Sequence, residues 1–232
     1  MIRALLLTIL SSSLLHAQKD ELPKVLILGD SISIGYTPYV QQMLKNEAKV
    51  LRPMQQNGKH PQNCSYTANG VKRIDAWLGD TKWDVIHFNF GLHDLKYIGQ
   101  ALPNAKIAPH KGAAIKKNPE ARQLSTIEDY LANLGKIVAR LKKTNAKLIF
   151  CTTTPVPEGS TGRISGDELK YNAAAIKLMK KLDVSVNDLH SYASQKKVAA
   201  LQRKADVHYS KEGSELLAEA VVSSLRSSLK SK

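Results

Sequence analysis

The chain has 232 residues, and its 34 lysines and arginines outnumber its 20 aspartates and glutamates, giving a net charge of +14. Hydrophobic residues make up 43% of the sequence, which excludes an intrinsically disordered chain. Two cysteines are too few for a disulfide-stapled scaffold or a cysteine-based zinc site. The basic excess leaves two alternatives open, an anionic partner or a solvated coat.

The first 17 residues have the pattern of a secretory signal peptide. Arg3 supplies a positive charge, an apolar run extends from Ala4 to Leu15, and Ala17 offers a small residue before a polar stretch. This run is shorter than the roughly 20 residues of a transmembrane helix, and an uncleaved N-terminal anchor is the alternative. We therefore expect a secreted or periplasmic protein without an integral membrane span, whose mature chain, residues 18–232, keeps a net charge of +13.

Strands and helices alternate along the mature chain. Apolar runs that suit the strands of a parallel sheet, buried on both faces, occur at residues 24–29, 50–54, 83–90, 147–154 and 184–189. Apolar residues at helical spacing occur at residues 39–45, 69–78, 127–141, 167–182 and 210–225. The alternation predicts a single α/β domain, a three-layer α/β/α sandwich around a five-stranded parallel sheet of flavodoxin-like order.

One connection is unusually long. Residues 99–123 are rich in alanine, proline and lysine and carry a charge of +4. Connections longer than about 15 residues are usually functional or disordered. The segment is either a basic rim facing a substrate or a solvated insertion.

Three polar segments follow strands or precede the last helix, and ligands of such sheets bind at the carboxyl edge of the strands. Gly29-Asp30-Ser31 follows the first strand, Gly91-Leu92-His93-Asp94 follows the third, and Asp206-Val207-His208 precedes the last helix. Serine, histidine and aspartate gathered at one edge are the parts of a nucleophilic hydrolase. Ser31 is the predicted nucleophile, and His208 is the base that takes its proton.

These segments resemble the motifs of the SGNH/GDSL hydrolase superfamily, in order and spacing, over nearly the whole mature chain. Residues 29–33 are similar to its first motif, residues 67–70 to its second, residues 91–94 to its third and residues 206–208 to its fifth. The resemblance implies the SGNH hydrolase fold. We expect no cofactor, and the spacing of the histidines gives no motif for a metal ion.

The resemblance also implies an oxyanion hole formed by the N–H groups of Ser31 and Gly70 together with His93. The family usually has asparagine where His93 stands. A histidine ring N–H can donate a hydrogen bond as well, although His93 could instead only pack or bond to a loop carbonyl. Asp30 and Asp94 are expected to organise hydrogen bonds around the site.

The acid of the expected triad is a second departure from the family. Its usual place, three residues before the histidine, is taken by Ala205, and Asp206 stands two residues before His208. We expect Asp206 to be the acid. The alternatives are a Ser–His dyad supported by a backbone carbonyl, and Asp188 at the end of the fifth strand.

The expected function is that of a serine esterase, without cofactor, which hydrolyses O-acyl esters. Family likeness points to O-acetyl groups on carbohydrate. The alternatives are a lysophospholipase or thioesterase of the same fold and a catalytically weakened glycan-binding protein. The expected partner is a small-molecule or glycan ester bound by a monomer, and scattered lysines without a recognition motif argue against nucleic acid.

The sequence also suggests the surroundings of the two cysteines and of one arginine. Cys64 lies in a polar loop and Cys151 in an apolar strand, so we expect buried thiols rather than a disulfide bond. Arg163 follows the fourth strand and is either a contact to substrate or a solvated surface residue.

Overall fold

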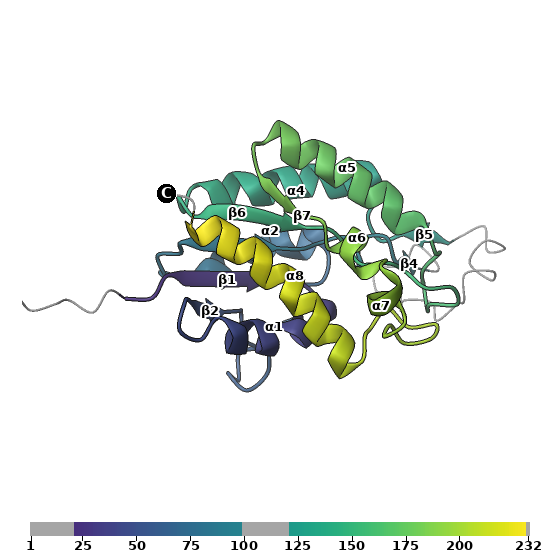
Figure 1. The fold of residues 1–232 in the computed structure, drawn as a ribbon. Coiled ribbons are helices and arrows are strands. Elements are labelled where there is room, and N and C mark those ends of the chain that lie inside the picture. The colour runs from purple at the N-terminus through teal and green to yellow at the C-terminus, as the bar shows by residue number, and fades with distance from the viewer. Residues whose placement is uncertain (1–20, 99–120, 231–232) are drawn as a thin grey trace, which may run out of the picture.

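The computed structural model describes residues 21–98 and 121–230 (Figure 1). Its main sheet has five strands, all parallel, in the order β2-β1-β3-β6-β7. The strands are β1 (Lys24–Leu28), β2 (Lys49–Leu51), β3 (Val85–Phe88), β6 (Lys147–Cys151) and β7 (Ser185–Asn187). The predicted five-stranded parallel sheet and the α/β class are confirmed.

Helices cover both faces of this sheet (Figure 1). The long helices are α1 (Ser31–Met43), α2 (Thr67–Leu78), α4 (Ile127–Lys142), α5 (Asp167–Lys181) and α8 (Lys211–Lys230). Helices α1 and α8 pack together on one side, while α2, α4 and α5 pack in series on the other. Two short helices, α6 (Leu189–Ala193) and α7 (Lys196–Ala199), lie between β7 and α8.

The first helix begins eight residues earlier than its apolar spacing predicts. Asp30 caps it, because the Asp30 carboxylate accepts a hydrogen bond from the Ile32 N–H at 2.9 Å. Pro38 therefore lies inside α1 instead of opening it. The Thr37 hydroxyl donates to the Ser33 carbonyl at 2.6 Å. The consequence is that Ser31 becomes the first residue of a helix that follows β1 directly.

The ends of the long connection are held together. Strand β4 (Tyr97–Ile98) pairs antiparallel with β5 (Arg122–Gln123). Residues 99–120, on which the two interpretations of the insertion depend, lie outside the described residues, as does the predicted signal peptide, residues 1–17. Within the described ranges, no helix is long and apolar enough to cross a membrane.

The core contains the two cysteines as separate thiols. Cys64 and Cys151 are both fully buried and unbridged, as expected. Burial raises the pKa of the Cys64 thiol to about 12, and it raises that of Cys151 as well. Both side chains therefore behave as small apolar groups.

His87 is a polar residue inside the sheet. It is fully buried in β3, and its Nε2 atom lies 3.2 Å from the Asn187 amide nitrogen of the edge strand. Since an amide nitrogen only donates, Nε2 accepts and the ring is neutral. Burial lowers the pKa of His87 from 6.5 to about 4.

This pKa predicts a loss of stability in acid. As the pH falls from about 6.5 to about 4, the unfolded chain binds a proton at His87 that the folded chain excludes. In His87→Gln, the free energy of unfolding should fall less between pH 7 and pH 4.5 than in the wild type, by about 2–3 kcal/mol. Urea titrations at both pH values measure the difference. His60→Gln, in an exposed loop, is the control. If the free energy of unfolding of His87→Gln falls between pH 7 and pH 4.5 as much as that of the wild type, His87 is not the source of the acid sensitivity.

Candidate active site

The Ser31 side chain lies at the junction of β1 and α1. The Asp30 side chain is buried and its carboxylate is used as the helix cap. The Ser33 hydroxyl donates to the Asp30 carbonyl at 2.7 Å, which fixes the turn from within the helix. As the first residue of α1, Ser31 has a backbone N–H without a partner in the helix. The turn thus presents both the hydroxyl and the N–H of Ser31 at the sheet edge.

His208 reaches Ser31 from the loop before α8. Its Nε2 atom lies 2.8 Å from the Ser31 Oγ, and its Nδ1 atom lies 2.7 Å from an Asp206 carboxylate oxygen. A carboxylate only accepts, so Nδ1 carries the proton and Nε2 accepts the hydrogen bond from the Ser31 hydroxyl. The three side chains therefore form a continuous chain of hydrogen bonds, in which Ser31 is far in sequence from the neighbouring Asp206 and His208.

The Asp206 carboxylate reaches the imidazole in spite of its shorter spacing. Ala205 adopts the left-handed conformation, with φ of 55°, which turns the chain just before the acid. The same carboxylate accepts the His208 backbone N–H at 3.2 Å. Burial alone would raise the pKa of Asp206, but these hydrogen bonds from His208 outweigh it and hold the pKa below its ordinary value.

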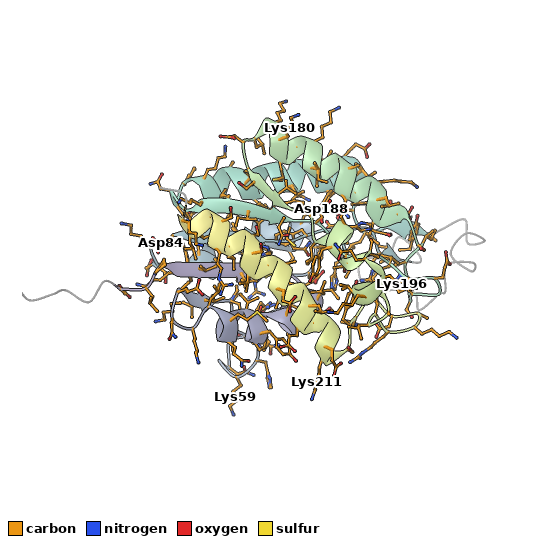
Figure 2. All side chains as sticks on the ribbon, in the orientation of Figure 1. Lys59, Asp84, Lys180, Asp188, Lys196 and Lys211 are labelled. Carbon is orange, nitrogen blue, oxygen red and sulfur yellow. The ribbon has the colours of Figure 1, made fainter. Side chains whose placement is uncertain are left out.

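The alternative acid, Asp188, is occupied elsewhere. It caps α6, where its carboxylate accepts the Ser191 N–H at 3.2 Å and the Ser191 hydroxyl at 2.6 Å. It also accepts the Thr152 hydroxyl at 3.1 Å. These contacts hold Asp188 in the β6–α6 region (Figure 2), and none of them involves His208.

The position of Gly70 does not support its expected role. Gly70 is buried inside α2, and its N–H donates to the Tyr66 carbonyl at 3.1 Å within that helix. A Cβ atom at this position would lie 2.8 Å from Ile137 Cδ1 and 2.9 Å from Phe90 Cζ. The glycine allows α2 to approach α4 and the segment that follows β3 closely. An oxyanion role for Gly70 is therefore corrected to a packing role.

The residue that meets His93 is instead Ser65, which sequence reasoning missed. Ser65 precedes α2 in the left-handed conformation, with φ of 62°, and its Oγ lies 3.4 Å from His93 Nδ1. The Ser65 N–H donates to the Asn63 side chain at 2.8 Å. A serine at positive φ has no distinct sequence signal, although the Asn63-Cys64-Ser65 loop directly before the helix is a place where such a turn occurs.

His93 itself is partly buried beside the triad. Burial lowers the pKa of His93, the charge of Asp30 opposes this shift, and the cations of Arg163 and Lys96 reinforce it. The ring is therefore neutral near pH 7 and keeps one N–H. If Nδ1 accepts the Ser65 hydroxyl, Nε2 is the nitrogen that donates.

Asp94 ties the surrounding loops together. Its buried carboxylate accepts the Thr67 N–H at 3.0 Å, the Thr67 hydroxyl at 2.5 Å and the Ser125 hydroxyl at 2.8 Å. Burial outweighs these hydrogen bonds and raises the pKa of Asp94 to about 6. The start of α2 and the segment before α4 are thereby anchored to the residue that follows His93.

Two arginines, Arg163 buried and Arg52 half-buried, hold the loops of the site. Arg163 donates from Nε to the Leu92 carbonyl at 2.8 Å, so it braces the His93 loop and is not a solvated surface residue. Arg52, which sequence reasoning missed, donates to the Gln62 carbonyl at 3.0 Å and to the Gly29 carbonyl at 3.4 Å. Arg52 thus links the Ser31 turn to the loop that carries Ser65.

Within residues 21–98 and 121–230, no three histidine, cysteine, aspartate or glutamate side chains gather in a way that could hold a metal ion.

The packing role of Gly70 predicts a stability effect. Gly70→Ala should lower the free energy of unfolding by about 1–3 kcal/mol, because the new methyl group overpacks the contact with Phe90 and Ile137. Urea unfolding measures this change. Gly135→Ala in α4 is the matched control: its Cβ would meet nothing within 4 Å, so it should raise stability by about 0.5–1 kcal/mol. Equal stability of Gly70→Ala and the wild type would count against the packing role.

Solved structures with the same fold include several ester hydrolases. An acetyl xylan esterase superposes with a TM-score of 0.63 at 16% identity, covering 87% of this chain and 99% of that one. A carbohydrate esterase family 3 protein from Talaromyces cellulolyticus also has a TM-score of 0.63 at 16% identity, over 90% and 99% of the two chains. A lipase/acylhydrolase from Enterococcus faecalis gives 0.63 at 18% identity, over 91% and 99%. At these identities the likeness shows the fold alone.

Sequence comparison gives the family. A GDSL esterase/lipase from Arabidopsis thaliana is 32% identical over 101 residues, which is 42% of this chain and only 40% of the plant protein. The model of the GDSL-like Lipase/Acylhydrolase family matches residues 27–216, a range that contains Ser31, His93, Asp206 and His208. Since this match spans most of the chain, the protein belongs to the GDSL-like lipase/acylhydrolase family.

Proposed function

We propose that the protein is a serine esterase that removes O-acyl groups, with O-acetyl groups on carbohydrate as its substrates. The observation that carries the proposal is the hydrogen-bonded chain from Ser31 through His208 to Asp206. We further propose that it acts as a monomer on a glycan outside the cytoplasm, after loss of residues 1–17. The acetyl xylan and family 3 carbohydrate esterases among its structural neighbours support the choice of substrate class.

In this proposal, His208 Nε2 takes the Ser31 proton as the Ser31 Oγ attacks the ester carbonyl carbon. Asp206 holds the imidazolium that forms. The bond to the alcohol oxygen then breaks, and His208 gives its proton to the departing alcohol. A water molecule, deprotonated by His208, attacks the acyl-enzyme and releases the carboxylic acid and free Ser31.

The negative oxygen of each tetrahedral intermediate needs hydrogen-bond donors. The Ser31 N–H at the start of α1 is one candidate, and the partial positive charge of a helix N-terminus supports it. The neutral ring of His93 is the second, donating from Nε2. This assignment replaces the asparagine amide of the resembled family motif with an imidazole N–H.

The groove beside Ser31 has groups that suit a sugar. It is lined by the hydroxyl groups of Ser210 and Ser214 and by the cations Arg203 and Lys211, together with Tyr39 and Tyr209. Hydroxyl and cationic side chains can bind the hydroxyl groups of a sugar, and an aromatic ring can pack against its apolar face. The complete hydrogen-bond chain argues against a weakened binding protein.

Hydrolysis of p-nitrophenyl acetate tests the triad. Ser31→Ala should abolish turnover, and Asp206→Asn should lower kcat by about 10²–10⁴ because the neutral amide no longer fixes the tautomer of His208. Asp188→Asn is the matched control and should stay near wild type, because asparagine also caps a helix. Equal losses in Asp206→Asn and Asp188→Asn would reject Asp206 as the acid, and a wild type inactive on all acetyl esters would reject the esterase.

The role of His93 has its own test. His93→Ala should lower kcat by about 10²–10³, the usual effect of removing one oxyanion donor. His93→Asn should recover part of this loss, because its amide also donates. Steady-state kinetics on p-nitrophenyl acetate measure both variants. A loss smaller than about tenfold in His93→Ala would reject the role.

A further inference from the structure

A groove of about 260 Å³ begins at the proposed nucleophile and extends between the starts of α1 and α8. Ser31 and His208 line one end, and Tyr39 and Ser214 lie farther along. In the proposed mechanism His208 must reach the departing alcohol oxygen, so the alcohol part of the ester leaves on the side of His208. This groove lies on that side and is therefore the place where the alcohol part binds.

The charged side chains that line the groove are the cations Arg203 and Lys211. Each has one carboxylate nearby. Asp206 lies 4.0 Å from the Arg203 Nη1 and is also hydrogen-bonded to His208. Glu212 does not line the groove, but its carboxylate interacts with Lys211 and with the hydroxyl of Ser210. A negative group bound here would meet both cations in competition with these two carboxylates.

Lys211 places a cation at the start of a long helix. It is the first residue of α8, a helix of 20 residues, and its side chain projects from that end into solvent (Figure 2). The amide dipoles make a helix N-terminus positive, and Glu212 is the acidic residue in the first turn of α8 that this favours. The start of α1 at the same groove adds to the positive potential.

We propose that this groove binds an acidic sugar, whose carboxylate pairs with Lys211 and Arg203 while a neighbouring O-acetyl group reaches Ser31. The inference rests on the esterase activity proposed above and names its substrate class more closely. The volume is slightly below the roughly 300–1,000 Å³ of sites for drug-sized ligands, which suits a single sugar ring. The ring lies against Tyr39 and the hydroxyl groups of Ser210 and Ser214 line the same groove.

The experiment compares two substrates that differ only at C6, the O-acetylated methyl glycosides of galacturonic acid, with a carboxylate there, and of galactose, with a neutral hydroxymethyl group. For the wild type, kcat/KM should be about 3–10-fold higher on the acidic glycoside, and added NaCl should reduce this ratio. Lys211→Gln should bring the ratio close to one, mainly through a higher KM for the acidic glycoside. Lys211→Glu should favour the neutral glycoside. Lys230→Gln, which removes the same charge from the exposed far end of α8, should keep the wild-type ratio.

The outcomes separate this inference from the function on which it rests. Failure to hydrolyse p-nitrophenyl acetate and both glycosides would overturn the esterase itself. Hydrolysis of both glycosides at equal kcat/KM, with Lys211→Gln unchanged, would overturn the acidic sugar and leave the esterase standing. Faster hydrolysis of a lysophospholipid than of either glycoside would also overturn it, because the cations would then serve a phosphate headgroup.

Discussion

Parallel pairing of β1 with β3 is the constraint on which the site depends. Leu28 and Phe88 are register partners at the ends of these strands, and the Asn89 N–H donates to the Leu28 carbonyl at 2.9 Å. The backbone therefore leaves the ends of β1 and β3 side by side, and Ser31 and His93 follow within a few residues of these two strand ends. The loop with His208 needs only to meet an edge that backbone hydrogen bonds have already fixed.

The sheet and its class could be predicted from the sequence, because buried parallel strands leave continuous apolar runs. The hydrogen-bonded group of Ser31, His208 and Asp206 could also be predicted, because these residues stand in segments that resemble the family motifs. The role of Gly70 could not be predicted, because a glycine that permits close packing cannot be told in the sequence from a glycine that donates its N–H to a ligand. The start of α1 was misplaced because Asp30 and Ser31 read as a loop motif, whereas their hydrogen bonds make them a helix cap. The position of Arg163, buried or at the surface, could not be predicted, because burial of an arginine depends on carbonyls far away in the sequence, such as that of Leu92.

The loops around the site contain three charged groups that are buried or half-buried. Asp94, Arg52 and Arg163 are held by hydroxyl groups, carbonyls and backbone N–H groups instead of by opposite charges. A buried charge without its hydrogen bonds is strongly unfavourable, so each of these groups specifies the position of its partners. The result is a rigid frame around a serine, histidine and aspartate that remain open to substrate.

The left-handed conformation of Ala205 links stability to turnover. For a residue with a side chain this conformation is unfavourable by about 1–2 kcal/mol, and glycine would adopt it freely. Glycine would, however, also visit other conformations in which the carboxylate of Asp206 no longer points to His208. Replacement of Ala205 by glycine would therefore remove the strain and let the acid leave the imidazole part of the time. The two-residue spacing between Asp206 and His208 therefore sets conformational stability against the alignment of these two side chains.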